Sequence, residues 1–437
     1  MGSSDQVVES RLEQTAAADH EPTSPPPFER ERWNRPKSNP FRLLASFFSF
    51  FLSGMNDAVY GALLPYIQSY YGLNYTNVSF IFLAPFGGYT VAAFTNAMIH
   101  AHFGQRGVAI VAPALHIADY VITCLHPPFP VIVVAAFLGG LGNGLLDAAW
   151  SAWIGQMEKA NIVQGVLHSM YSVGATICPL IATSMVTQLN MGWYEFFYLM
   201  VGASVFEAVT LSLTFWKKTG IVYQQQTHGN SDTPTHEKTG NRRALMNKIT
   251  WLCSSFFFFY LCIEVTMSGW VTSFMLNVRR ASPYEAGLSS TLFWAGQTVG
   301  RAFLGPVTER YGERLCVSIY LALSIALELV FWLVPHFLAS AIAVAFLGLF
   351  LGPMFPSATI MAAKLLPRHL HVSSLGFSIA IGGTGGAIGP FVVGPIAYAR
   401  GVWVLQPIVL TLLGILAVLW LVFPRIKNEE SDNTSTR

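Results

Sequence analysis

Twelve long apolar runs constrain this chain of 437 residues more than any other feature, because they fall into two sets of six with recurring motifs. The recurring residues lie 208 to 211 positions apart and are Gly104 and Gly312, Arg106 and Arg314, Phe137 and Phe346, and Gly174 and Gly385. Motifs that return in the same order at nearly one spacing indicate that the second set repeats the first in the same sense. We therefore expect two copies of one six-span unit.

The runs are long enough to cross a bilayer as helices, which takes about 20 residues each. Hydrophobic residues make up 53% of the chain and charged residues 11%, and the mean hydropathy is +0.47. This composition excludes a set of soluble domains, and continuous apolar character excludes the alternating strands of a membrane barrel. The expected spans are 41–67, 77–100, 107–126, 131–155, 163–188, 194–216, 249–276, 284–307, 315–334, 337–362, 371–397 and 402–423. The expected fold class is an all-α membrane protein with twelve transmembrane helices arranged as two six-helix repeats.

Polar segments flank and separate the two sets of spans. The expected division is a disordered cytosolic N-terminal tail at 1–40, a first six-helix half at 41–216, a cytosolic linker at 217–248, a second half at 249–423 and a cytosolic tail at 424–437. The first segment is polar and lacks an apolar core, so it does not resemble a cleaved signal peptide.

The distribution of basic residues predicts the orientation in the membrane. With odd-numbered loops outside, 22 Lys and Arg residues fall inside and 3 fall outside. This asymmetry predicts that both termini are cytosolic. Two glycosylation sequons, at Asn74 and Asn77, then lie in the first outside loop. We expect a multi-pass protein of the plasma membrane, with the vacuolar membrane as the alternative.

The loop between spans eight and nine carries a glycine, an acidic-basic pair and a second glycine followed by a basic residue. Its candidate gate residues are Gly305, Glu309, Arg310, Gly312 and Arg314, with Arg301 preceding them. This pattern resembles the signature loop of the major facilitator superfamily, and the resemblance implies a cytosolic gate. Ordinary anchoring by positive charge is the alternative. The first-half copy, Ala97 to Arg106, lacks the acidic-basic pair, which predicts a gate latched mainly by the second half.

Charged residues inside spans are costly in a bilayer and are functional candidates for that reason. Span one contains Asn56-Asp57, followed by Pro65, and span four contains Asn143 and Asp147 after a Gly-Leu-Gly segment. Here the chain resembles the fucose–proton symporter family and the fungal "bypass of stop codon" group. The resemblance implies substrate binding and proton coupling by Asp57 and Asp147. Structural hydrogen bonding between helices is the alternative.

Further candidates lie in spans four, five and seven. Glu264 and Trp270 are in span seven, and Glu264 is either a site residue or an interhelical partner of Arg301. Trp150 could stack on a solute or belong to the interfacial belt. His168, in span five, could relay a proton. For His116, Asp119, Glu207 and Glu328, in spans three, six and nine, we expect structural roles.

Several chemistries have no motif in this sequence. The five cysteines fall within or at the ends of spans without metal-ligand spacing, so neither a metal site nor a disulfide is expected. A nucleotide-binding loop and a nucleophile elbow are also missing, which argues against ATP-driven transport and against an enzyme. We expect no cofactor and no nucleic-acid partner.

The sequence thus predicts a secondary active transporter of a small organic solute, sugar-like by the family resemblance, working by alternating access. The expected partners are the solute, a proton as coupling ion and the lipid bilayer, and the protein is expected to be a monomer. One alternative is an efflux transporter for a fungal secondary metabolite. A second is a transporter-like nutrient sensor.

Overall fold

The computed structural model describes residues 31–222, 246–366 and 371–424, so most of both tails and of the linker lies outside the described residues. Within the described ranges the chain is helical, apart from an isolated β-bridge between Arg32 and Arg35. The helices of the first half are α2 (Asn39–Tyr71), α3 (Tyr75–Val78), α4 (Phe80–Cys124), α5 (Phe129–Gly155), α6 (Ala160–Thr187) and α7 (Phe196–Phe215). Those of the second half are α10 (Lys248–Asn277), α11 (Pro283–Val299), the π-helix η2 (Gly300–Leu304), α12 (Gly305–Tyr311), α13 (Glu313–Leu333), α14 (Phe337–Leu351), α15 (Met354–Leu365), α16 (His371–Arg400) and α17 (Leu405–Val422).

These helices correspond to the twelve expected spans, although their boundaries differ at three places. Helix α4 holds spans two and three, separated at Gly104, where the backbone is not helical. Span eight is divided into α11, η2 and α12. Span ten breaks at Gly352-Pro353, between α14 and α15, as the Gly-Pro pair predicts. Because spans two and three form one segment and span eight is divided, ten segments of the described chain are long and apolar enough to span a membrane, and span ten counts as one of them across its break.

The turn after the second span of each half confirms the repeat in atomic detail. Gly104 and Gly312 both have positive φ angles, of 68° and 93°, which a residue with a Cβ rarely adopts. The following arginines both reach the end of the last helix of their own half. Arg106 lies 3.5 Å above the ring of Trp216, beyond α7, and Arg314 donates to the carbonyl of Phe423, beyond α17, at 2.7 Å.

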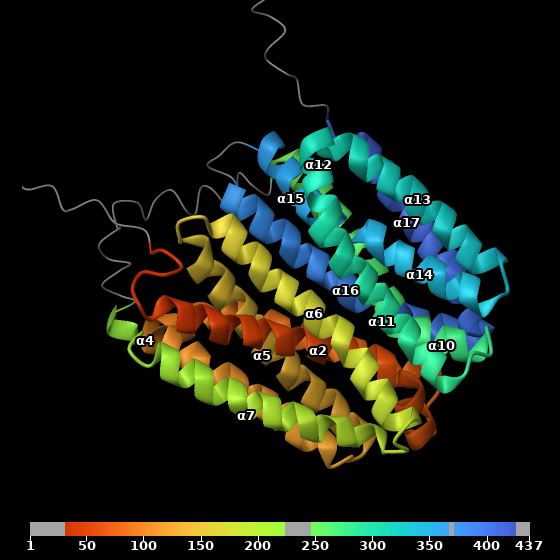
Figure 1. The fold of residues 1–437 in the computed structure, drawn as a ribbon, viewed down its shortest axis with the longest axis horizontal. Coiled ribbons are helices and arrows are strands. Elements are labelled where there is room, and N and C mark those ends of the chain that lie inside the picture. Colours follow the sequence, from red (N-terminus) through yellow and green to blue (C-terminus); the bar gives the residue numbers. More distant parts are fainter. Residues whose placement is uncertain (1–30, 223–245, 367–370, 425–437) are drawn as a thin grey trace, which may run out of the picture.

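The two halves lie side by side, with the first at the lower left and the second at the upper right of Figure 1. Within the halves, α2 packs on α6 and α10 packs on α16. Glycines allow these close crossings. A Cβ at Gly54 would lie 2.0 Å from the carbonyl oxygen of Tyr171, and one at Gly385 would lie 2.1 Å from that of Phe258.

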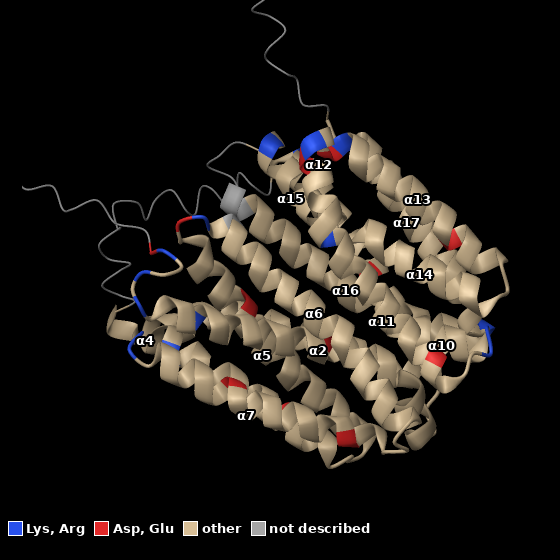
Figure 2. Ribbon diagram, in the orientation of Figure 1, with Lys and Arg blue, Asp and Glu red and all other residues tan. Residues whose placement is uncertain are grey.

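Lys and Arg gather at one end of the helix bundle, near α4, α12 and α15 in Figure 2. We call this the basic end; it carries Arg32, Arg106, Lys218, Arg310 and Lys364. The opposite end, which we call the far end, is where α2 ends at Tyr71 and α10 ends at Asn277.

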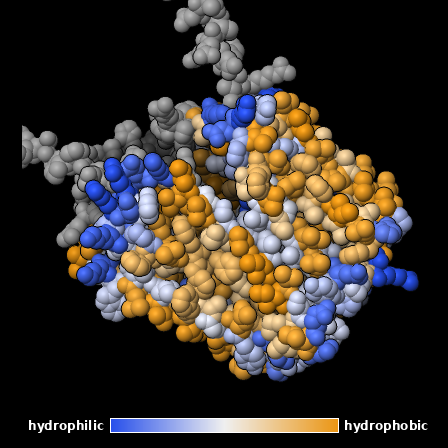
Figure 3. All heavy atoms as spheres, viewed as in Figure 1, coloured by the Kyte–Doolittle hydropathy of each residue, from blue (hydrophilic) through white to orange (hydrophobic). Residues whose placement is uncertain are grey.

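The halves meet toward the far end. A Cβ at Gly61 of α2 would lie 2.1 Å from the carbonyl oxygen of Ser268 in α10. The ring of Trp270 lies 5.8 Å from that of Tyr75, and Phe80 lies 5.1 Å from Phe391. Toward the basic end, the surface in Figure 3 is hollowed between the charged groups of the two halves. The structure is therefore closed at the far end and open at the basic end.

Candidate functional site

Asp57 lies in the middle of the first half with two hydrogen-bond donors on its carboxylate. Asn143 of α5 donates to Oδ1 at 3.0 Å, and the Tyr171 hydroxyl of α6 donates to Oδ2 at 2.9 Å. The side chain is half-buried. The structure thus brings Asp57 and Asn143 together, as two of the residues singled out in the sequence. Asn56, the residue before Asp57 in α2, is buried, and its Oδ1 has no hydrogen-bond partner within the described part of the chain.

Arg301 is the centre of a second polar group, which joins the two halves. Its guanidinium forms a salt bridge with Glu264 of α10 at 2.8 Å and donates to Gln297 at 2.9 Å. It also donates to the Ser172 hydroxyl of α6, in the first half, at 2.5 Å. The structure therefore pairs Glu264 with Arg301 of another helix, and a role of Glu264 in binding solute stays a prediction.

The local backbone explains how Arg301 reaches this position. Residues 300–304 form a π-helical turn, a rare geometry that widens the helix and is frequent at functional sites. Helix α11 is also pressed against α14, because a Cβ at Gly296 or Gly300 would lie 2.0 Å from a carbonyl oxygen of α14. The widened turn lets Arg301 leave this tight helix pair and point toward the first half.

Helix α6 connects the two polar groups. Tyr171 binds Asp57 and the adjacent Ser172 binds Arg301, so one turn of helix touches both. Thr176 and Thr298 lie 3.2 Å apart one turn further on, and the rings of Tyr171 and Trp294 are 6.3 Å apart. The arrangement can therefore transmit a change at Asp57 to the contact between the halves.

Asp147 and His168 lie nearer the basic end and are both exposed. The Ser151 hydroxyl donates to Asp147 at 3.3 Å. These two candidates therefore face the open side of the interface rather than the buried pair of Asp57 and Asn143.

The two tryptophan candidates are both fully buried. Trp150 stacks on Phe215 of α7, with ring centroids 4.3 Å apart, inside the packing of the first half. This position separates it from the interface, so we leave it out of the proposed solute site. Trp270 donates its indole N–H to the Pro390 carbonyl at 2.9 Å and contacts Tyr75, which places it in the far-end closure.

The candidate gate residues lie at the basic end, within the second half. Glu309 and Arg310 are exposed, Gly305 begins α12, and Gly312 follows its last residue. Arg314 donates to the carbonyls of Phe423 and Leu421, at 2.7 and 3.3 Å. In this open arrangement Arg314 binds the end of α17 rather than the first half, and the gate role stays a prediction.

Sequence reasoning did not single out Tyr171, Ser172 or Gln297. Gln297 lies one helical turn before Arg301, a spacing that places both on one face and could have indicated it. Tyr171 and Ser172 carry no comparable signal, because hydroxyl residues are common in membrane helices.

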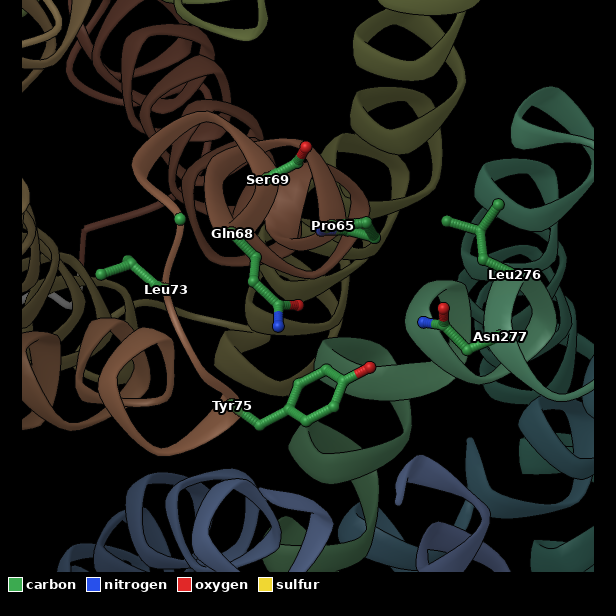
Figure 4. Close-up of a pocket in the computed structure, with 8 residues that line it drawn as sticks. Pro65, Gln68, Ser69, Leu73, Tyr75, Leu276 and Asn277 are labelled. Atoms are coloured by element: carbon green, nitrogen blue, oxygen red, sulfur yellow. The ribbon is translucent and has the colours of Figure 1, made fainter.

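Of the sequon asparagines, Asn77 lies in the short helix α3 at the far end and Asn74 directly precedes this helix. The Asn74 side chain caps this helix by accepting from the Asn77 N–H at 2.8 Å, and Asn77 itself is exposed. Next to them is an open pocket of about 340 Å³ between the halves. Figure 4 shows Gln68, Tyr75 and Asn277 around it together with apolar residues such as Leu276, so its lining is uncharged and of mixed polarity.

Two repeats of six membrane helices with a charged polar interface define a transporter of the major facilitator type. The sequence model of the Major Facilitator Superfamily matches residues 46–280 and 252–437, and the chain belongs to this superfamily. It is a multi-pass integral membrane transporter.

Similar proteins include two transporters and a protein named for a genetic effect. Bypass of stop codon protein 6 of Saccharomyces cerevisiae is 29% identical over 89% of this chain and 84% of its own length. A glucose/galactose transporter of Brucella abortus is 24% identical over 85% of this chain and 92% of its own. The crystal structure of FucP in the outward conformation matches with a TM-score of 0.61 at 16% identity, covering 89% of this chain and 99% of that one. The structural match concerns the fold alone.

Proposed function

We propose that this transporter moves a small sugar-like solute by alternating access, coupled to protons through Asp57. The observation that carries the proposal is the connection through α6, in which Tyr171 binds Asp57 and Ser172 binds Arg301 of the other half. A proton on Asp57 removes the charge that Tyr171 and Asn143 now bind. Through α6, protonation of Asp57 can therefore affect the contact between Ser172 and Arg301 that joins the halves.

The names of similar proteins support both parts of the proposal. A sugar transporter matches most of this chain, and a second matching structure is that of an Escherichia coli fucose:proton symporter. The side chains fit such a solute, since amides and hydroxyls can bind sugar hydroxyls and aromatic rings can pack on the apolar face of a sugar. Near the interface these groups are Asn143, Tyr171, Trp294 and Gln297.

Asp147 and His168 have a distinct role in this proposal. They are exposed on the open side, where they can exchange protons with water before Asp57 does. Arg301, which is held by Glu264, joins the two halves through its hydrogen bond to Ser172. This bond has to break when the halves separate at the level of Ser172. The candidate gate residues at 305–314 would close the basic end in the opposite state.

We further propose that the basic end faces the cytosol, as the excess of Lys and Arg there favours. The structure then represents an inward-open state, and Asn77 and Asn74 are glycan acceptors outside. Tags at Met1 and Arg437 should resist protease in intact cells, and Asn77→Gln with Asn74→Gln should remove a mass shift on gels. Accessible tags and an unmodified α3 would reverse the orientation.

Proteoliposomes test the coupling. With radiolabelled glucose, galactose and fucose as probes, an imposed inward proton gradient should drive wild-type uptake of at least one sugar above equilibrium. Asp57→Asn should abolish accumulation but retain counterflow exchange, and Asp147→Asn should slow accumulation less. If the wild type exchanges sugar but ignores the gradient, the proton part is wrong. If it moves none of the three sugars, the solute class is wrong.

A further inference from the structure

A buried ion pair lies behind Asp57, on the side away from the interface. His116 of α4 and Glu207 of α7 are both fully buried, and the imidazole Nδ1 lies 2.9 Å from Glu207 Oε2. The Ser49 hydroxyl of α2 donates to Oε1 of the same carboxylate at 2.5 Å. Three helices thus meet at one carboxylate inside the first half. A buried pair of this kind is costly to form in a bilayer, and such residues are usually functional.

The other nitrogen of the imidazole points to the helix that carries Asn143. Nε2 of His116 and Oδ1 of Asn143 are buried and have no direct hydrogen-bond partner among the described residues. A Cβ at Gly142 would lie 2.8 Å from that Nε2, so the α5 backbone beside Asn143 touches the ring. Asn143 is the polar side chain that lies near the imidazole on this side, without a direct hydrogen bond to it.

The amide orientation follows from chemistry. The Asp57 carboxylate only accepts, so the Asn143 amide nitrogen must face it, as the 3.0 Å contact shows. The amide oxygen is then directed to the other side, where His116 lies. Both imidazole nitrogens therefore face acceptors, a carboxylate and an amide oxygen, and both require a hydrogen. An imidazolium at His116 would satisfy both sides of the ring.

The other ionisable groups around the ring are few. Asp119, on the same helix, is fully buried and accepts from Thr123 at 3.2 Å, and Asp57 lies on α2. The ring of Tyr120 is stacked 5.9 Å from the imidazole, and the Tyr60 hydroxyl of α2 lies close to both aspartates. From α5 the facing group is the uncharged Asn143, and from α7 it is Glu207. His116 is thus the basic group of a cluster of buried carboxyl groups.

We propose that the His116–Glu207 pair is a second protonation site, which holds the Asn143 amide toward Asp57 and so sets the pH at which Asp57 loads its proton. His116 is a positioning residue, since it acts through Asn143. When His116 is an imidazolium, the amide is fixed and the ionised Asp57 is favoured. When His116 gives up a proton, the amide is released and Asp57 loses a donor. The inference rests on the proposed proton coupling.

The test is the pH profile of gradient-driven uptake in proteoliposomes. His116→Gln/Glu207→Gln removes both charges at once and leaves no unpaired charge behind. We expect it to shift the half-maximal pH upward by about one unit, because the nearby cation is gone, while counterflow at saturating sugar stays within twofold. In an Asn143→Ala background, the same double change should shift the profile by less than a third of that amount.

Glu328→Gln is the matched control. Glu328 is a fully buried carboxyl of α13 in the second half, and neither of its oxygens has a hydrogen-bond partner among the described residues. It should leave the pH profile unchanged. A double variant with the wild-type profile would overturn the inference, and so would a loss of monodisperse protein in both this variant and His116→Gln. A wild type without any pH dependence would instead contradict the proposed coupling.

Discussion

The two halves share one backbone plan but place their ionisable groups at different depths. In the first half, the ion pair of His116 and Glu207 is fully buried between helices. Asp57 is bound there by two uncharged side chains, Asn143 and Tyr171. In the second half, Glu264 and Arg301 lie at the interface, where Arg301 is 23% exposed. Glu328 is fully buried in the second half, and its carboxyl oxygens have no hydrogen-bond partner among the described residues. Under the proposed function, the duplicated fold has separated two tasks, with proton binding in the first copy and contact between the copies in the second.

The sharpest way to break this comparison is to remove one member of the interface pair. Arg301→Met leaves Glu264 buried and unpaired, and should lower the free energy of unfolding by about 3 kcal/mol. Arg301→Met/Glu264→Gln removes both charges and should recover most of that loss. Thermal unfolding of the detergent-purified protein measures both. Equal losses in the two variants would show that the salt bridge is not the relevant contact.

The contact between the halves can be tested separately at the far end. A methyl group at Gly61 would lie 2.1 Å from the Ser268 carbonyl oxygen, whereas one at Gly414 of α17 meets nothing within 4 Å. Gly61→Ala should disfavour the closed far end by about 2 kcal/mol, roughly a thirtyfold change in population. Maleimide labelling of Ser79→Cys, at a fully buried position, reports the opening.

Native cysteines interfere little with this labelling, because all five are buried. The labelling rate should rise in Gly61→Ala and stay unchanged in Gly414→Ala. If both substitutions leave it unchanged, the halves do not pivot at Gly61.

The equivalent turns offer a smaller and symmetric test. Arg314→Ala removes two hydrogen bonds to the end of α17 and should cost about 1 kcal/mol. Arg106→Ala removes the cation–π contact with Trp216 and should cost about 0.5–1 kcal/mol. Chemical unfolding of single variants measures each. A loss of transport without a loss of stability at Arg314 alone would instead assign it to the gate.

The smallest effect is expected where the N-terminal residues meet the first half. Glu31 accepts from Lys218 at 2.9 Å and from Trp153 at 3.3 Å. Burial alone would raise its pKa, but Lys218, Asn39 and Trp153 outweigh burial and lower the pKa below the ordinary value. The contact therefore stabilises the fold above the pKa of the unfolded chain and is lost as the pH falls through the lowered value.

Glu31→Gln should thus reduce stability by about 0.5 kcal/mol at neutral pH and should flatten the fall in thermal midpoint between about pH 5 and pH 3. Glu313 of the second half, which binds Lys364 at 2.7 Å, provides the comparison at the same end of the bundle. A wild-type pH response in Glu31→Gln would show that other carboxylates cause it.

Hydropathy and motif spacing predicted the twelve spans and their duplication, because a bilayer requires each helix to be long and apolar. The same pattern could not locate the π-helical turn at 300–304, since no apolar period marks it. It could not separate Trp150 from the site either, because a tryptophan that packs on Phe215 has the same hydropathy as one that binds solute. One hydrogen bond of Asp57 comes from Tyr171 of α6. The sequence did not indicate Tyr171, because an uncharged tyrosine is not unusual in a membrane helix.

The approach of Gly61 to Ser268 bears on how such a protein can diverge. The contact joins a glycine to a main-chain carbonyl, so its geometry does not depend on any side chain at the interface. Under the proposed function, descendants of this gene could exchange Trp294, Gln297 or Tyr171 and acquire a new solute while keeping this contact between the halves. Selection at the site and selection on the movement can then proceed independently. A lineage of transporters can diversify its substrates quickly while its architecture stays old.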